Sequence, residues 1–406
     1  MSESAAPGPA ARPAPARRRP VGLTLVCDRI VVGGAETWLL NLFRHLDPTV
    51  VRPRVICFKE PGPVGPEFAA AGFDVEVLGR GGRYDLATLP RLAGRLRATG
   101  TDVVLVHHLH PAPLTLGRLA ARLTGRRSIV TPHGMDTLAV TGRRCLPRHD
   151  VETLFLSDAV VWLAPSQARY FHEQEHVGRH PWSRTREVVI PNGIPLPPPT
   201  TPATRATARA LLGLGEDEVA VGVVARLMPV KAHEVLLGAV AELAPSRPGL
   251  RLVVVGGGVR AAELAALTRS LGIEEHVRFL GMRRDVPALL PGLDVGCLSS
   301  RYECAPLSLV EQMAAGAPVV TTEVGAVRDM VTDGQEGFVV PVGDAAAFAD
   351  RLRRLVDDPG LRAAMGGRAR ARVERQFRIE DTAAAFERLV TSLVPGAGPP
   401  PDAQPA

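Results

Sequence analysis

Two carboxylates flank the start of a short helix that the sequence predicts between Pro306 and Gly316. Proline suits the first helical position because its φ is fixed and it has no amide hydrogen to lose, and glycine is typical of a helix end. Glu311 would border the buried face, where a carboxylate needs hydrogen-bond donors that the local sequence does not supply. Glu303 would lie in the preceding loop. Because a helix start suits phosphate, the stretch predicts one end of a site for an anionic, hydroxyl-rich ligand. The alternative is an ordinary helix with solvated glutamates.

Two cations follow the first predicted strand of the second half of the chain. Arg226 and Lys231 bracket a strand-to-helix turn, five residues apart, so both can converge on one anion at the helix start. A guanidinium fork beside an ammonium point charge is a common pairing around phosphate. Arginine fills nearly every cationic position, and Lys59 and Lys231 are the only lysines. The pair therefore indicates a phosphate site, with chance retention of the lysine as the alternative.

Three positions in the first half could form an opposite wall. Gly33 and Gly34 precede an amphipathic helix that runs through Leu46, and they allow the backbone to approach a ligand, although a plain turn also explains them. His133 follows a buried strand and precedes a glycine, where a neutral imidazole in an inter-domain cleft could hydrogen-bond a sugar hydroxyl. A structural histidine is the competing interpretation.

Other motifs argue against alternative chemistries. The sequence has histidines at 107, 108 and 110, but alternation at a strand end sends neighbours to opposite faces, which disfavours a metal site with His133. Residues 252–261 formally match G-x-G-x-x-A, yet close helix–sheet packing explains these glycines better than a dinucleotide. Pro191-Asn-Gly-Ile194 predicts a junction turn whose glycine can take positive φ. The five cysteines form no C-x-x-C pair, which fits a reducing cytoplasm.

Length and composition favour a two-domain globular protein. A chain of 406 residues exceeds the usual size of one core, and 46% hydrophobic with 22% charged residues is ordinary for a soluble protein. Half of the +6 net charge belongs to residues 1–20, and the rest is too small to indicate nucleic-acid binding. The tail has no apolar signal-peptide core, and no segment is long enough to span a bilayer. We therefore expect a cytoplasmic protein.

Strand-like runs alternate with helix-like runs, which is typical of parallel sheets covered by helices. The predicted strands are 22–27, 54–58, 74–78, 102–107, 128–131, 160–164 and 187–190 in the first half, and 220–225, 251–256, 277–280, 294–298, 318–322 and 337–341 in the second. Two doubly wound α/β domains follow, with their strand ends facing a cleft. The expected divisions are a disordered tail 1–20, a domain 21–195, a proline-rich linker 196–204, a domain 205–377, a helix 378–394 and a disordered tail 395–406.

Taken in order, the motifs resemble the retaining glycosyltransferases of family 4. They are Gly33-Gly34-Ala35-Glu36, His133, Pro191-Asn192-Gly193, Arg226-x4-Lys231 and Glu303-x7-Glu311. The similarity runs from residue 21 to about 394 and is most specific over 279–344. It implies two facing Rossmann-like domains of the GT-B type, an acceptor held by the first, a nucleotide-sugar donor held mainly by the second, and a last helix that crosses back onto the first.

The resemblance also implies roles for the site residues. Arg226 and Lys231 would hold the donor diphosphate, and Glu311 would accept hydrogen bonds from the ribose diol. Glu303 would position hydroxyls of the transferred sugar, and His133 would face its distal hydroxyl. The remaining expected substrate contacts are Gly33, Gly34, Met282, Leu307 and Ser308.

The chain departs from the family pattern at Ala232 and Cys304, where glycine is usual, and at Gln312, where alanine is usual. None of these changes removes a charge, although Cys304 could narrow the sugar pocket. No D-x-D occurs, so we expect neither metal nor cofactor, and leaving-group charge must be met by the two cations and helix-start amides. Double displacement would need a carboxylate nucleophile that we cannot assign, and the family suggests front-face attack.

The resulting prediction is a hexosyltransferase that uses a UDP-sugar, or secondly a GDP-sugar, and a hydroxyl acceptor in cell-surface glycan, glycolipid or natural-product biosynthesis. The alternatives are a nucleotide-sugar epimerase and a non-catalytic nucleotide-sugar binder. A pyridoxal-phosphate phosphorylase is less favoured, since it needs a Schiff-base lysine. The helical runs 86–98 and 113–124 carry arginines that could bind an anionic membrane surface, but the abundance of arginine favours ordinary solvated faces.

Overall fold

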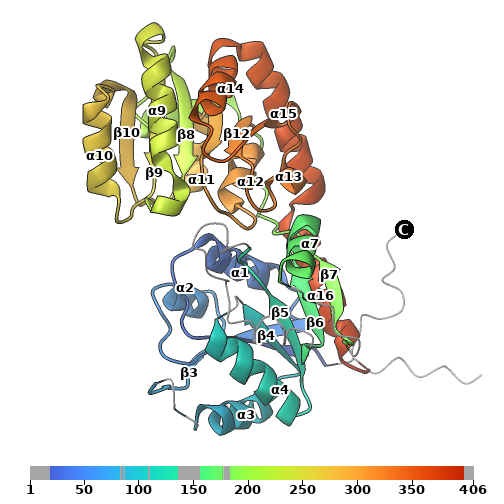
Figure 1. Ribbon diagram of the computed structural model, residues 1–406. Helices are drawn as coiled ribbons and strands as arrows, with labels where there is room; N and C mark the ends of the chain where they lie inside the picture. Colours follow the sequence, from blue (N-terminus) through green and yellow to red (C-terminus); the bar gives the residue numbers. More distant parts are fainter. Residues whose placement is uncertain are drawn as a thin grey trace, which may run out of the picture.

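The computed structural model describes residues 19–82, 85, 87–107, 110–135, 156–175, 177 and 183–396. These residues form two parallel β-sheets in separate halves of the molecule (Figure 1). All thirteen predicted strands are confirmed, with ends shifted by up to three residues. The tails predicted to be disordered lie outside the described residues except for 19–20 and 395–396.

The first sheet has seven strands in the order β3-β2-β1-β4-β5-β6-β7. Its strands are β1 Val21–Cys27, β2 Val51–Cys57, β3 Val75–Val77, β4 Val103–His107, β5 Arg127–Thr131, β6 Ala159–Trp162 and β7 Arg186–Val189. Its helices are α1 Gly34–His45, α2 Gly65–Ala70, α3 Thr88–Ala98, a π-helical turn Pro113–Gly117, α4 Arg118–Leu123 and α7 Pro165–Glu173.

The second sheet has six strands in the order β10-β9-β8-β11-β12-β13. Its strands are β8 Val219–Val224, β9 Leu250–Val255, β10 Val277–Gly281, β11 Val295–Leu298, β12 Val319–Thr322 and β13 Gly337–Val340. Its helices are α8 Pro202–Leu211, α9 His233–Leu243, α10 Ala261–Ser270, α11 Val286–Leu289, α12 Leu307–Ala314, α13 Val327–Met330, α14 Ala345–Asp357 and α15 Pro359–Gln376, with 3-10 turns at Pro229–Lys231, Ala244–Ser246, Glu274–His276 and Leu290–Gly292.

Each sheet has one point where the strand order reverses. In the first sheet β1 pairs with both β2 and β4, and in the second β8 pairs with both β9 and β11. The connections on either side of such a point leave in opposite directions, which opens a crevice at the carboxyl ends of the strands. The loops after β1, β8 and β11 contain Gly33, Arg226, Lys231 and Glu303, so the topology brings these candidate site residues to the crevices.

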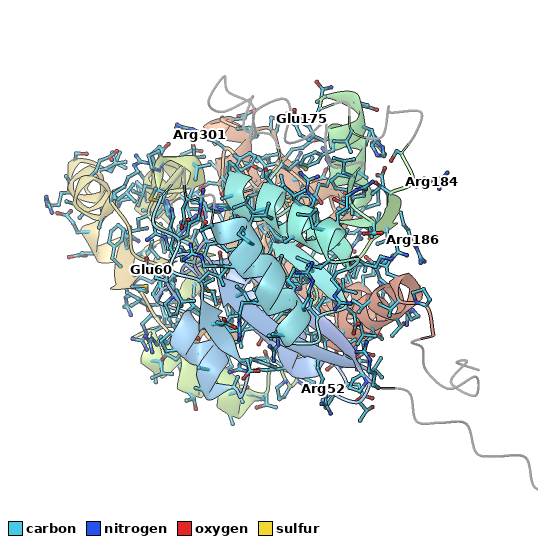
Figure 2. The ribbon with its side chains drawn as sticks, turned by 90° about the horizontal axis from the view of Figure 1, so that it is seen from below. Arg52, Glu60, Glu175, Arg184, Arg186 and Arg301 are labelled. Atoms are coloured by element: carbon cyan, nitrogen blue, oxygen red, sulfur yellow. The ribbon has the colours of Figure 1, made fainter. Side chains whose placement is uncertain are left out.

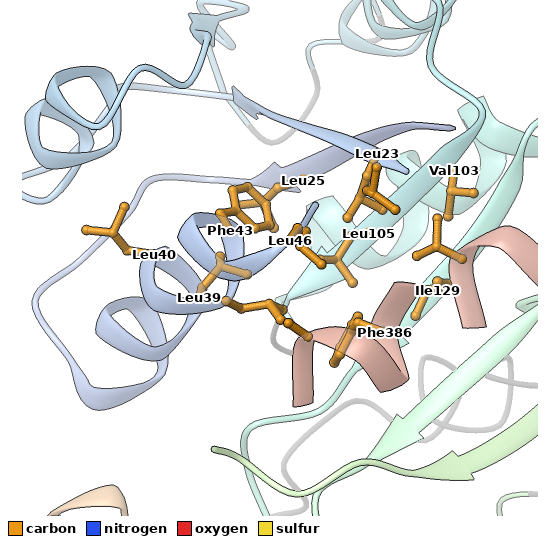
Figure 3. Packing of buried hydrophobic residues seen from close by; sticks show 14 of the residues in the cluster. Leu23, Leu25, Leu39, Leu40, Phe43, Leu46, Val103, Leu105, Ile129 and Phe386 are labelled. Carbon is orange, nitrogen blue, oxygen red and sulfur yellow. The ribbon is translucent and has the colours of Figure 1, made fainter. Parts of the chain in front are cut away.

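The last helix, α16 Ile379–Leu393, returns to the first half (Figure 1). Phe386 of α16 lies in one buried cluster with Leu39 of α1 and Leu105 of β4 (Figure 3). The chain crosses at the junction turn, where Ile194 N donates to Phe377 O at 2.8 Å. A Cβ at Gly193 would lie 2.3 Å from the Arg378 carbonyl oxygen, so glycine is needed for this close approach.

Three details differ from the sequence-based expectations. Gly193 does not use the positive φ that a glycine can take in such a turn, because its role is the close approach to the crossing chain. Helix α8 begins at Pro202, inside the predicted linker 196–204, because Thr201 and Thr204 form a reciprocal capping box. Pro306 is the residue before α12 and not its first residue, since its ψ of 108° is extended.

Helices α3 and α4 cover one face of the first sheet, seen in the foreground of Figure 2. Arg91 pairs with Asp85 at 2.5 Å, and Arg95 pairs with Glu76 at 2.6 Å. Arg118 is buried and donates to the Leu114 carbonyl oxygen at 2.6 Å. These arginines have ion-pair or hydrogen-bond partners within the protein. This favours solvated or structural positions over a membrane-binding face. In the described part of the chain, no helix is both long and apolar enough to cross a membrane.

Candidate active site

Lys231 and Glu303 form the centre of the candidate site. The Lys231 ammonium donates to Glu303 Oε1 at 2.5 Å, and Ser300 Oγ donates to the same oxygen at 2.7 Å. The two ionised side chains are 18% and 10% exposed, so they interact in a partly water-excluded setting. Ser299 Oγ donates to the Lys231 carbonyl at 3.1 Å and thereby ties the turn after β8 to the loop after β11. Sequence reasoning placed both residues at the site but did not foresee their pairing.

Ala232 gives the turn after Lys231 its shape. It is fully buried and has φ 46° and ψ 44°, in the left-handed region where L-residues are disfavoured. This conformation explains why glycine is usual here. Alanine, the smallest residue with a Cβ, adopts it with modest strain, and α9 begins directly afterwards.

Glu311 lies on α12 and is half-buried. Burial raises the pKa of its carboxyl above the ordinary value. None of the residues that the structure describes donates a hydrogen bond to it, in agreement with the prediction that its donors are not local. No described side chain caps the start of this helix, and Leu307 and Ser308 in its first turn are half-buried. Within the described ranges, a carboxylate that receives no hydrogen bond therefore lies one turn from a helix start that no side chain caps.

Arg226 and Met282 flank a glycine-rich loop. The Arg226 guanidinium is exposed, and no residue in the described ranges pairs with it. Met282 is 74% exposed, and a Cβ at Gly257 would lie 3.7 Å from its Cβ. A Cβ at Gly256 would come 1.9 Å from the Ala225 carbonyl oxygen, and one at Gly258 would come 2.4 Å from that of Leu227. Close packing thus explains the glycines. The segment packed against them is the loop after β8, whereas the sequence predicted packing of a helix against the sheet.

Gly34 brings the two halves together. It is the first residue of α1, and a Cβ there would lie 3.7 Å from Leu307 Cδ1 at the start of α12. Gly33 precedes the helix in an extended conformation, where a Cβ would come 2.5 Å from Glu36 Oε2. The two helix starts therefore face each other across the halves.

His133 lies beside the same junction. Its ring centroid is 5.0 Å from that of Trp38 and 4.1 Å from that of His107. Among the described residues no three histidine, cysteine, aspartate or glutamate side chains group as a metal site, and His108 lies outside those residues. The imidazole is half-buried, so it can reach a ligand from an aromatic wall.

Sequence reasoning missed Gln167 and Tyr302, which lie next to these loops. Gln167 Nε2 is 3.2 Å from Cys304 Sγ, and Tyr302 Oη accepts a hydrogen bond from Met135 N at 2.5 Å. Cys304 packs with Met135 and Leu163 at the contact between the halves, so its side chain faces the first half. Neither residue belongs to a motif, and only the fold brings them to the site.

The comparisons with known proteins cover both halves. Residues 204–372 match the model of glycosyl transferases group 1, and residues 32–196 match that of glycosyltransferase family 4. A D-inositol 3-phosphate glycosyltransferase of Actinosynnema mirum is 37% identical over 193 residues, 45% of this chain and 46% of that protein. The aligned region is thus about half the length of that relative. An N-acetyl-alpha-D-glucosaminyl L-malate synthase of Bacillus anthracis is 28% identical over 312 residues, 75% of this chain and 78% of that protein.

Solved structures show the same fold. Anabaena HepE in complex with UDP superimposes with a TM-score of 0.80 at 21% identity, covering 92% of this chain and 100% of that one. The same protein has a structure in complex with UDP-glucose, with a TM-score of 0.77 at 22% identity over 91% of this chain and 99% of that one. The expected pair of Rossmann-like domains is confirmed.

Proposed function

The chain belongs to the group 1 glycosyl transferases of family 4, and on this premise we propose that it is a retaining, metal-independent hexosyltransferase. It would move a hexosyl unit from a nucleoside-diphosphate sugar to a hydroxyl acceptor. The observation that carries the proposal is Glu311, a half-buried carboxylate that no described residue satisfies, close to the uncapped start of α12. Glu311 would bind the 2′,3′-diol of a nucleotide ribose, and the helix start would bind the phosphate attached to the other end of the same ribose.

The donor diphosphate would lie between Arg226, Lys231 and the first amides of α12. Arg226 is exposed and unpaired within the described ranges, so it can turn towards a phosphate without breaking an ion pair. Lys231 would keep one donor on Glu303 and offer another to the diphosphate, since an ammonium has three. Glu303 keeps acceptor capacity for hydroxyls of the sugar, and His133 would face a hydroxyl from the opposite side.

The chemical step we propose is front-face displacement. The bond between the anomeric carbon and the phosphate oxygen breaks, and a bond from the acceptor oxygen forms on the same face. The proton of the acceptor hydroxyl passes to the departing phosphate oxygen. Negative charge on the diphosphate is met by Arg226 and Lys231, which act without a metal ion.

A UDP-sugar is our first choice of donor and a GDP-sugar the second. The support is that HepE, with the same fold, binds UDP and UDP-glucose. The acceptor would be a hydroxyl group of a cell-surface glycan, a glycolipid or a natural product, reached in the cytoplasm or at the inner face of the membrane.

The test begins with thermal unfolding in the presence of UDP-glucose, UDP-N-acetylglucosamine, UDP-galactose and GDP-mannose, in EDTA. A true donor stabilises the folded protein because it binds only that state. The stabilising sugar nucleotide is then incubated with the enzyme, with and without hydroxyl acceptors. Release of the nucleoside diphosphate supports transfer or donor hydrolysis. Conversion of the sugar without release indicates an epimerase, and binding without reaction indicates a non-catalytic binder.

A further inference from the structure

Gln167 is a fully buried amide at the contact between the two halves. It lies in the first turn of α7, which faces the second half in Figure 1. Its Oε1 accepts a hydrogen bond from Leu163 N at 2.6 Å, and this bond fixes the direction of the amide group. The Nε2 group is then directed to the opposite side, where a buried donor must find acceptors.

Three acceptors surround Gln167 Nε2. The carbonyl oxygens of Pro132 and Gly134, at 2.9 and 3.3 Å, are those of the two residues that flank His133. The third acceptor is Cys304 Sγ at 3.2 Å, in the residue directly after Glu303. One side chain therefore bridges the loop that carries His133 and the loop that carries Glu303.

A second contact joins the same loops. Tyr302, directly before Glu303, accepts a hydrogen bond from Met135 N at 2.5 Å. A third, Ser166 N to Asp329 Oδ2 at 3.2 Å, fixes the start of α7 against the second half. The backbone around His133 is thus held by Gln167 at residues 132 and 134 and by Tyr302 at residue 135.

We propose that Gln167, with Tyr302, is a positioning residue that sets the His133 imidazole relative to the Lys231–Glu303 pair. This inference rests on the proposed function, in which both loops face the transferred sugar. Ring contacts with Trp38 restrain the His133 side chain, whereas the hydrogen bonds of Gln167 fix the position of the adjoining backbone. A displacement of about 1 Å at such a site lowers the reaction rate by roughly 100-fold.

The test compares Gln167→Met, which keeps the volume and removes the hydrogen bonds, with Gln174→Met, a matched control at an exposed glutamine just beyond α7. For hydrolysis or transfer of UDP-glucose, kcat should fall by about 30-fold or more in Gln167→Met and by less than about twofold in the control. The Kd for UDP should change by less than about threefold in both, because the diphosphate and ribose contacts are unaltered.

A double-mutant cycle separates positioning from general structural damage. In a His133→Ala background, Gln167→Met should lower turnover by less than about threefold, because the group it positions is gone. An equal factor in both backgrounds, or full turnover in Gln167→Met, overturns the proposal. Tyr302→Phe serves as the second variant if Gln167→Met fails to fold, with the same expectations.

Amide hydrogen exchange keeps the inference testable if the proposed function fails. If the unaltered protein binds and turns over no nucleotide sugar, the function is wrong, but peptides containing residues 131–135 still report on the contact. They should exchange at least about tenfold faster in Gln167→Met than in Gln174→Met. Unchanged exchange in these peptides contradicts the positioning role.

Discussion

Lys231 and Glu303 form a 2.5 Å ion pair at the adjoining ends of β8 and β11. Because both side chains are largely shielded from water, each holds the other in place before any ligand arrives. In the proposed function, the ammonium would contact a phosphate and the carboxylate a sugar hydroxyl without rearrangement of the backbone.

Lys231→Ala should lower sugar transfer by at least about 100-fold, because charge on the departing diphosphate loses its point cation. It should also lower the free energy of unfolding by up to about 3 kcal/mol, because the Glu303 carboxylate loses its counterion. Lys59, exposed and the only other lysine, provides the matched control Lys59→Ala. Urea unfolding and UDP-release assays give both readouts, and full activity in Lys231→Ala would refute the diphosphate assignment.

Glu311→Gln should stabilise the ligand-free protein and weaken its binding of the donor. Burial raises the pKa of Glu311, so the folded state disfavours its ionised form, and the stability deficit is present at pH values above the raised pKa. The unaltered protein should prefer UDP over 2′,3′-dideoxy-UDP, and Glu311→Gln should largely lose that preference. Calorimetric titration of both nucleotides checks this, with Glu173→Gln on exposed α7 surface as the control. Undiminished discrimination in Glu311→Gln would rule out the ribose role.

Stability should fall as the pH is lowered from about 6.5 to about 4 because of His233. Burial, assisted by the charge of Arg260, lowers the pKa of His233 from 6.5 to about 4, and neither ring nitrogen has a hydrogen-bond partner among the described residues. The unfolded chain binds more protons in this range, so the contribution present above pH 6.5 is lost on acidification, on the order of 3 kcal/mol at most.

His233→Leu should therefore flatten the pH dependence of the urea midpoint between pH 4 and 6.5. His45→Leu, at an exposed position on α1, should leave the slope unchanged. Equal slopes in the unaltered protein and His233→Leu would show that another group carries the effect.

Ala232→Gly should preserve activity and change the free energy of unfolding by less than about 1 kcal/mol. Relief of the left-handed strain, worth about 1–2 kcal/mol, is offset by the greater entropy of an unfolded glycine. Ala232→Val should instead destabilise by more than about 2 kcal/mol, because a β-branched residue fits neither this φ nor a fully buried site. Thermal unfolding distinguishes the two, and a stable Ala232→Val protein would show that the turn adapts.

More of the fold than of the candidate site could be predicted from the sequence. Strands buried on both faces, such as Val103–His107, are continuous apolar runs and are recognisable for that reason. Partly exposed strands, such as Val75–Val77, are recognisable only from the alternation of strand-like and helix-like runs. Helix α8 was hidden within a proline-rich stretch because its start depends on a Thr201–Thr204 capping box. The tasks of the acceptor and donor halves and the domain boundaries stay predictions.

At the site, the sequence could supply residue types but not their partners. Glu311 was recognisable because its position on a helix face creates a local demand for donors. The ion pair of Lys231 with Glu303 spans 72 positions and depends on adjacent β8 and β11. Gln167 reaches Cys304 across 137 positions and has no local signal at all. The ion pair follows from the strand order of the second sheet, and the Gln167–Cys304 contact follows from the packing of the two halves.

The most direct test of the account is the anomeric configuration of the sugar released or transferred from its UDP-sugar, followed by proton NMR in EDTA. We expect the α-anomer to appear first from a UDP-α-linked hexose, without added metal. Lys231→Ala should slow its appearance by at least about 100-fold, and Lys59→Ala should not. An initial β-anomer would contradict a retaining mechanism. A reaction abolished by EDTA would contradict the proposal that Arg226 and Lys231 meet the diphosphate charge without a metal ion.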